Sequence, residues 1–188
     1  MVVGTSAGKK YASSFLKFGV LWGLFCFFFS FEIRAQELNE IRREYYEAVN
    51  SGTAADDFYN KLHKLQPSKP VLFAYYGSAQ ALKSRYSFNP YNKIKYLNEG
   101  RKTLARAVAK SPDDLEIRFL RFSLEHYIPA FLGMSDNLDI DRKKIILLIK
   151  KKQYGAVDKS LLKNLISFLK QTKRCTPREL HILAEAGS

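Results

Sequence analysis

Residues 70–114, PVLFAYYGSAQALKSRYSFNPYNKIKYLNEGRKTLARAVAKSPDD, carry the signals of two helices joined by a turn. Pro70 stands where a helix accepts proline, at its first position, and predicts a helix over residues 71–83. Asn89, which precedes a second proline, is typical of a helix cap and predicts a longer helix over residues 90–110. The segment is therefore expected to form a helical pair.

Residue sizes repeat along the second helix of this pair. Small, large, small and proline residues follow one another at Gly100, Leu104, Ala107 and Pro112, and a similar series with the same offsets occurs earlier at Ala55, Tyr59, Leu62 and Pro67. In the first helix, Gly77 costs about 1 kcal/mol relative to alanine, so we expect it to permit close approach by a neighbouring helix.

The rest of the chain also shows apolar residues at helical spacing, and no segment alternates as a strand does. Further helices are expected over residues 37–49, 53–65, 115–127, 141–152 and 160–169, with a short last helix that begins at a capping box of Thr176 and Glu179. Thr53 is expected to cap the second helix, and residues 126–141 are expected to contain an ordered loop. The fold class is predicted to be all-α.

The first 35 residues have the composition of a secretory signal peptide. Lys9, Lys10 and Lys17 precede a run of 14 uncharged residues, 18–31, which is shorter than a bilayer-spanning helix. We expect cleavage after Ala35, with retention of residues 1–35 as a short N-terminal anchor as the alternative. Residues 36–188 are then the size of a single domain, predicted to lie in the periplasm or at the cell envelope.

The chain is strongly basic, with 31 Lys and Arg residues against 18 Asp and Glu residues and a net charge of +13. Four of these bases and one acid lie in residues 1–35, so the predicted mature chain keeps a net charge of +10. Such a balance favours polyanions as partners. Export argues against specific nucleic acid binding, and the sequence has no zinc-finger, RNA-binding or basic-zipper pattern.

The repeated series of residue sizes resembles the second helix of the tetratricopeptide repeat, a helical pair of 34 residues. In that frame residues 36–69 form a first unit of 34 residues, and residues 70–114 form a second unit that is 11 residues longer. Eleven residues are about three helical turns, so a longer second helix would absorb them without turning its apolar face.

Individual positions follow the repeat pattern only in part. Phe73, Tyr76 and Gly77 stand at its aromatic, large apolar and glycine positions, whereas Leu62 replaces a small residue and Gln80 replaces an aromatic one. The resemblance covers about half of the chain after residue 35. It implies antiparallel hairpins in a right-handed array whose concave surface binds a peptide or partner protein, and it implies no chemistry. A compact helical bundle is the alternative arrangement.

Catalytic and metal sites have no support in the sequence. The three histidines lie in different elements, without a second ligand at metal spacing: His63, His126 and His181. Three acids, Asp136, Asp139 and Asp141, lack the glycine and closing glutamate of a calcium loop, and we interpret them as favouring a helix start. Nucleophile, phosphate-loop and metalloprotease motifs do not occur. We therefore expect a non-enzymatic protein without cofactor, whose Cys175 is a partly buried spectator.

Two sets of residues are candidates for partner binding. Aromatic residues are more numerous in residues 75–96 than a short helical pair can bury, and the candidates are Tyr75, Tyr76, Tyr86 and Tyr91. The second set, Lys150, Lys151 and Lys152, would contact an anionic envelope component, with a solvated face as the alternative.

These sets correspond to two functional hypotheses. We expect an interaction module that binds a protein or peptide through the aromatic residues. The alternative is a basic envelope protein that binds an anionic surface, and an unrecognised enzyme is the third hypothesis.

Overall fold

The computed structural model describes residues 36–187, and the chain divides into two compact units, residues 1–42 and 43–188. Of the first unit, only residues 36–42 are described, and they are helical. The predicted signal peptide over residues 1–35 lies outside the described residues. Among residues 36–187, no helix combines the length and apolar character that crossing a bilayer requires.

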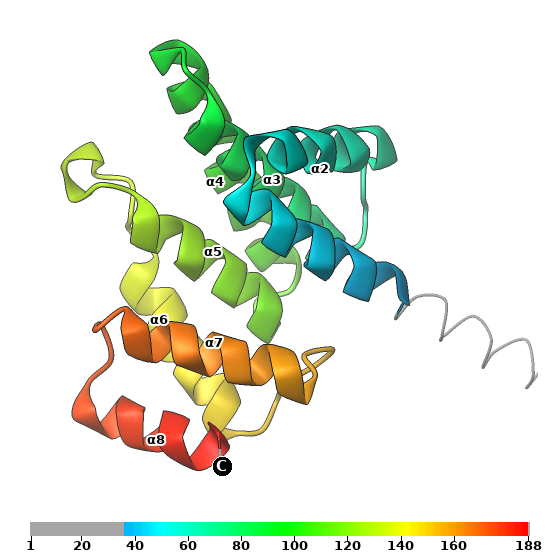
Figure 1. The fold of residues 1–188 in the computed structure, drawn as a ribbon. Coiled ribbons are helices and arrows are strands. Elements are labelled where there is room, and N and C mark those ends of the chain that lie inside the picture. Colours follow the sequence, from blue (N-terminus) through cyan, green and yellow to red (C-terminus); the bar gives the residue numbers. More distant parts are fainter. Residues whose placement is uncertain (1–35, 188) are drawn as a thin grey trace, which may run out of the picture. The chain divides into compact units, whose positions relative to one another are not determined.

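The described part of the second unit is helical and contains no strand, which confirms the all-α prediction. Residues 43–50 are helical. They are followed by α2 (Gly52–Leu65), α3 (Pro70–Tyr86), α4 (Pro90–Lys110), α5 (Leu115–Tyr127), the short 3-10 helix η1 (Ala130–Leu132), α6 (Leu138–Lys150), α7 (Lys159–Gln171) and α8 (Pro177–Gly187) (Figure 1).

Side-chain caps explain where several helices begin. The Asn89 side chain accepts a hydrogen bond from the Tyr91 amide, so α4 starts at the predicted proline. The predicted capping box at α8 is confirmed, because the Glu179 amide donates to Thr176 Oγ1 and the Thr176 amide donates to Glu179 Oε2. Thr53 is not the cap of α2; the Ser51 hydroxyl accepts from the Ala54 amide instead.

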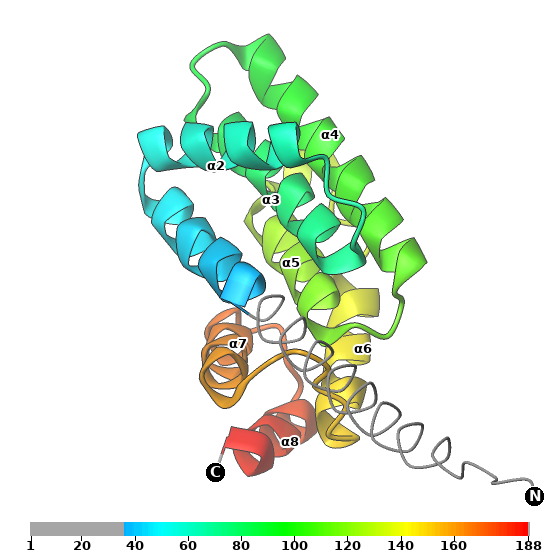
Figure 2. The same ribbon diagram turned by 90° about the vertical axis from the view of Figure 1, so that its right-hand side faces the viewer.

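Two glycines bring α3 and α4 into backbone contact. A Cβ added to Gly100 would lie 2.7 Å from the Gly77 carbonyl oxygen, and one added to Gly77 would lie 3.0 Å from Leu104 Cγ. The predicted close approach at Gly77 is therefore confirmed. These two helices make the most extensive contact in the unit, with lengths of 17 and 21 residues (Figures 1 and 2).

The helices that precede and follow α3 and α4 in the sequence pack against this pair. Helix α3 also packs against α2 and α5, and α4 packs against α5, so α3 is covered on several sides. The Tyr75 hydroxyl of α3 donates a 2.7 Å hydrogen bond to Glu116 of α5, and both residues are buried. This buried bond joins the first hairpins to the helices that follow.

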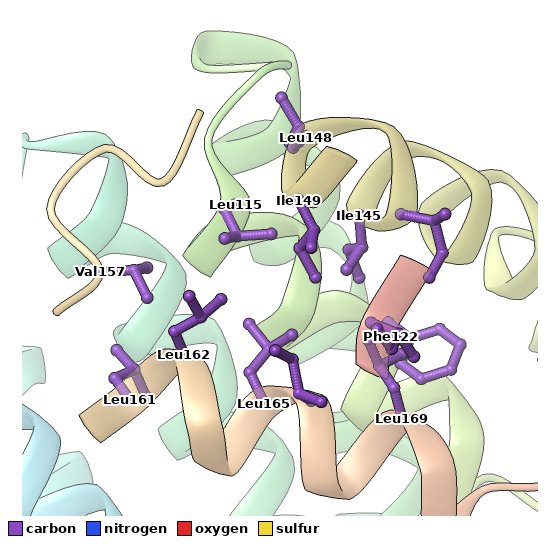
Figure 3. Close-up of a cluster of buried hydrophobic side chains, with 13 residues drawn as sticks. Leu115, Phe122, Ile145, Leu148, Ile149, Val157, Leu161, Leu162, Leu165 and Leu169 are labelled. Atoms are coloured by element: carbon purple, nitrogen blue, oxygen red, sulfur yellow. The ribbon is translucent and has the colours of Figure 1, made fainter. Parts of the chain in front are cut away.

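An aliphatic cluster fills the space between α5, α6, α7 and α8. Figure 3 shows Leu161, Leu165 and Leu169 in a row along α7, on the face toward Leu115 and Phe122 of α5. The α6 side of the cluster consists of Ile145, Ile146, Leu148 and Ile149. Spacings of three and four residues give α7 a continuous apolar stripe, which explains why this helix forms and which face it buries.

Asp141 occupies a different position from the predicted one. Helix α6 begins at Leu138, so Asp141 lies inside its first turn and is completely buried. Its carboxylate accepts bonds from Arg121 Nε at 2.6 Å and from Arg118 Nη1 at 2.8 Å. Asp139 and Asp141 therefore lie at a helix start, as interpreted from the sequence, but α6 begins three residues before Asp141, and the burial of the Asp141 carboxylate against two arginines of α5 was not predicted.

Candidate partner-binding surface

Three tyrosines and one histidine from three helices gather on the α2, α3 and α4 side of the unit. We call Tyr59 and His63 of α2, Tyr76 of α3 and Tyr96 of α4 the tyrosine cluster. The Tyr59 ring stacks on His63 with centroids 5.5 Å apart and on Tyr76 at 6.1 Å, and it meets Tyr96 edge-on at 5.7 Å. The three tyrosines are half-buried and His63 is exposed, so part of each residue is accessible to solvent.

Local sequence spacing explains this arrangement. Tyr59 and His63 are four residues apart on α2, which places them on one face of that helix. The glycine contact holds α3 and α4 close together, so Tyr76 and Tyr96 reach the same place from two helices.

A hydrogen bond fixes the tips of two rings. His63 Nδ1 lies 2.8 Å from the Tyr76 hydroxyl, so these two side chains share a hydrogen bond. Withdrawal from water, followed by the neighbouring Tyr76, raises the pKa of Tyr59 to about 12. Burial also raises the pKa of Tyr76 above its ordinary value of 10.0. Both hydroxyls therefore stay protonated at neutral pH and act as neutral hydrogen-bonding groups.

Lys83 of α3 adds a positive charge at the edge of the tyrosine cluster. Its Nζ lies 4.8 Å from the centre of the Tyr59 ring and 5.5 Å from that of Tyr96, within the range of cation–π attraction. The same ammonium pairs with Asp56 of α2 at 2.9 Å. The cluster thus combines flat aromatic area, hydroxyl groups and a pair of opposite charges, which suits a polar peptide better than an apolar ligand.

Only one of the four tyrosines selected from the sequence belongs to this cluster, namely Tyr76. Tyr75 is 3% exposed and lies in the core, so a partner cannot reach it, and the expectation that it lines a binding surface is wrong. Tyr86 is half-buried, and its hydroxyl donates to the Val49 carbonyl at 2.7 Å, which ties α3 to the end of the helical residues 43–50 that precede α2. Tyr91 is 76% exposed at the start of α4 and lies outside the cluster.

The three lysines selected from the sequence lie at the end of α6. Lys150, Lys151 and Lys152 are all exposed. Lys144, earlier in α6, pairs with Asp113 in the connection between α4 and α5. The lysines therefore lie toward the end of the hairpins opposite the α3–α4 turn, and the structure does not bring them together with the tyrosine cluster.

Arg142, earlier in α6, is not a solvated cation. Arg142 is 7% exposed and pairs with Glu179 of α8, and it reaches Asp139 at 3.3 Å. Arg142 therefore holds α6 to α8. Long-range partners of this kind have no signal in the local charge pattern.

The side chains of His126, Glu125 and Cys175 contact groups of the protein itself. His126 Nδ1 accepts a 3.0 Å hydrogen bond from Arg174 Nε. The neighbouring Glu125 carboxylate accepts a 2.8 Å hydrogen bond from the Asn137 backbone amide. Cys175 is a partly buried free thiol, as predicted, and burial raises its pKa. Within the described residues, no three His, Cys, Asp or Glu side chains gather where they could hold a metal ion.

Sequence reasoning missed Tyr59 and His63 as members of a surface. Tyr59 occupies the large position of the repeated series, which suggested a residue that packs between helices. A single histidine does not indicate a binding surface unless its neighbours in space are known. Their four-residue spacing was the available signal. No protein-family model, curated protein sequence or solved structure matches the chain.

Proposed function

We propose that residues 36–188 act as an exported, non-enzymatic interaction module of the periplasm or cell envelope, which binds a protein or peptide at the tyrosine cluster. The observation that carries this proposal is the gathering of Tyr59, Tyr76 and Tyr96, all half-exposed, from three helices. Tyrosine is enriched in protein interfaces because its rigid ring offers a large contact area and its hydroxyl a hydrogen bond.

The packing of the helices supports a tetratricopeptide-like array within this proposal. The small positions of the resemblance, Gly77 and Gly100, lie in backbone contact between α3 and α4. Helix α3 packs against α2, α4 and α5, as the first helix of a repeat packs against its own partner and its neighbours. The second repeat of the resemblance, residues 70–114, is 11 residues longer than the family's unit. Its two helices, α3 and α4, are long and are joined by a short turn, which accommodates this extra length.

Affinity capture with matched variants tests the proposal. The full-length protein is immobilised, exposed to an envelope extract, and washed at low and high salt, and any retained protein is then purified and titrated directly. We expect Tyr59→Ser or Tyr96→Ser to weaken its binding by about thirtyfold, as for an interface hot spot. Tyr127→Ser is the control, because Tyr127 is 72% exposed and lies outside the cluster.

The alternative function, binding of an anionic surface, rests on the exposed lysines at the end of α6. Joint replacement of Lys150, Lys151 and Lys152 by Gln would abolish retention in that case, and high salt would release every ligand. Retention that survives high salt and both tyrosine substitutions would contradict the proposed site. Circular dichroism of each variant shows whether the helices are intact.

A further inference from the structure

The turn between α3 and α4 exposes apolar side chains at the end of the longest hairpin. We call residues 85–95 the α3–α4 tip. Phe88 is 100% exposed, Tyr91 is 76% exposed and Ile94 is 41% exposed. Figures 1 and 2 show this turn reaching past α2, away from the other described helices of the unit. A phenylalanine without any contact at the end of a projecting hairpin has no role in packing the fold.

Hydrogen bonds on both sides of Phe88 hold the α3–α4 tip in shape. The Ser84 hydroxyl of α3 donates to the Lys93 carbonyl of α4 at 2.8 Å, which ties the two helices together below the turn. The Ser87 hydroxyl donates to the Lys83 carbonyl at 2.7 Å, and Asn89 caps α4. Phe88 is therefore presented by a rigid turn, so the entropy of ordering the turn is already lost before a ligand binds.

The charged residues of the tip itself are all cationic. Residues 84–98 contain Arg85, Lys93 and Lys95, all exposed, and no acidic residue. On the neighbouring helix α2, Asp56 is paired with Lys83. Cations beside an exposed aromatic group match the anionic headgroups and the acyl boundary of a lipid bilayer. A second copy of the same tip would bring like charges together, which argues against self-association here.

A second exposed phenylalanine shows that this combination is specific to one turn. Phe131, in the connection between α5 and α6, is 86% exposed. Residues 128–137 around it contain no Lys or Arg and include one acid, Asp136. The two turns thus expose the same side chain in surroundings of different charge, and Phe131 is a matched control for Phe88.

We propose that the α3–α4 tip docks on an anionic phospholipid bilayer, with Phe88 and Ile94 at the acyl boundary and Arg85, Lys93 and Lys95 among the headgroups. This site differs from the tyrosine cluster and from the lysines of α6, so it holds or fails independently of the proposed protein-binding function. Such docking would orient the hairpin with its tip on the membrane.

A local probe tests this docking in the full-length chain. The apolar residues 18–31 can attach the chain to vesicles by themselves, so total binding is not informative. In a background with Cys26→Ser and Cys175→Ser, Phe88→Cys carries an environment-sensitive fluorophore, and Phe131→Cys carries it in the control protein. Each is mixed with vesicles of phosphatidylcholine alone or of phosphatidylcholine with phosphatidylglycerol.

We expect a blue shift at position 88, with quenching by nitroxide-labelled lipid, only on the vesicles that contain phosphatidylglycerol. Position 131 should keep its aqueous emission on both. Unchanged emission at position 88, or equal shifts at both positions, overturns the docking proposal. An equal shift at position 88 on both vesicle types overturns the requirement for anionic lipid.

Substitutions in the α3–α4 tip separate its apolar and charged contributions, with the fluorophore moved to Tyr91→Cys. Phe88→Ser should raise the lipid concentration for half of the emission change by about tenfold, because one aromatic group no longer leaves water. Arg85→Gln with Lys95→Gln should raise it by roughly 25-fold, at about fivefold per cation. Phe131→Ser should leave it unchanged. Equal effects of Phe88→Ser and Phe131→Ser would contradict insertion of the tip.

Discussion

The α2–α4 region and the α5–α8 region of the second unit are held together by different kinds of contact. In the first, backbones touch through Gly77 and Gly100, and tyrosines fill the surface above them. In the second, leucines and isoleucines form a continuous cluster, and Asp141 is buried between arginines. The stability of the first region should therefore depend on the small size of its glycines. The stability of the second should depend on the pairing of its buried carboxylate, so different substitutions should destabilise the two regions.

The two proposed contact sites also lie in only one of these regions. The α2–α4 region carries the tyrosine cluster and the exposed Phe88, which are the two proposed contact sites. In the α5–α8 region, the polar residues Asp141 and Glu125 are buried and bind groups within the protein. These two buried residues therefore stabilise the fold and are not accessible to a partner.

Removing the buried carboxylate should have the largest effect. Asp141→Ala would leave Arg118 and Arg121 without the carboxylate that both of them bind. Breaking a buried ion pair from one side typically costs about 3–5 kcal/mol, so we expect the free energy of unfolding to fall by about that amount. Urea denaturation followed by circular dichroism measures this change.

The control for that prediction lies two residues earlier. The Asp139 carboxylate is 78% exposed and contacts Arg142 at 3.3 Å, so Asp139→Ala should cost about 0.5 kcal/mol or less. Equal losses in the two variants would mean that burial of Asp141 does not determine its contribution.

Adding one methyl group should test the other region. Gly100→Ala would place a Cβ 2.7 Å from the Gly77 carbonyl oxygen and 3.0 Å from the Ala81 amide nitrogen, and these are backbone atoms that cannot rotate away. Overpacking costs about 1–3 kcal/mol, and alanine regains up to about 1 kcal/mol of helix propensity. We expect a net loss of about 1–2 kcal/mol in urea denaturation.

Asn164→Ala in α7 gives the propensity gain without the steric contact, because Asn164 is exposed. Its stability should be unchanged or slightly higher. If Gly100→Ala behaved in the same way, the α3–α4 hairpin would have room to separate, and shape would not limit the α2–α4 region. Native-state hydrogen exchange of α3 and α4 amides would show such a separation as faster exchange.

Local signals determined how much of this fold could be predicted. The start of α4 was predictable because asparagine followed by proline is a helix-capping signal that needs only adjacent residues. The start of α8 was predictable for the same reason, because Thr176 and Glu179 lie within one turn of each other. The start of α6 was predicted three residues too late, at Asp141 instead of Leu138, and the burial of Asp141 against Arg121, which lies 20 residues away in the sequence, was not predicted. A pattern that resembles helix-starting acids carries no information about such partners.

The candidate site shows the same limit at the level of adjacent residues. Tyr75 and Tyr76 have nearly the same local sequence, yet one is buried against Glu116 and the other joins a surface with Tyr59. Adjacent residues on a helix point about 100° apart, and only the packing of α2, α4 and α5 decides which direction is the core. Composition identified the aromatic segment but not the exposed face.

A smaller effect, on pH dependence, should distinguish the regions further. His126 of α5 stacks on Phe122, and its Nδ1 accepts a bond from Arg174. Burial, and then the charge of Arg174, lower the pKa of His126 below its ordinary value of 6.5. The unfolded chain therefore binds this proton more readily than the folded chain does. The stabilising contribution is present above about pH 6.5 and is lost as pH falls through the folded pKa.

His126→Gln should therefore make the free energy of unfolding fall less steeply between neutral and mildly acidic pH than it does in the unsubstituted protein. Urea denaturation of both proteins across that range measures the two slopes. Identical slopes would contradict a lowered pKa at His126, even if the substitution changed stability by a constant amount. The slope is the informative quantity, because lost packing against Phe122 is the same at every pH whereas proton binding is not.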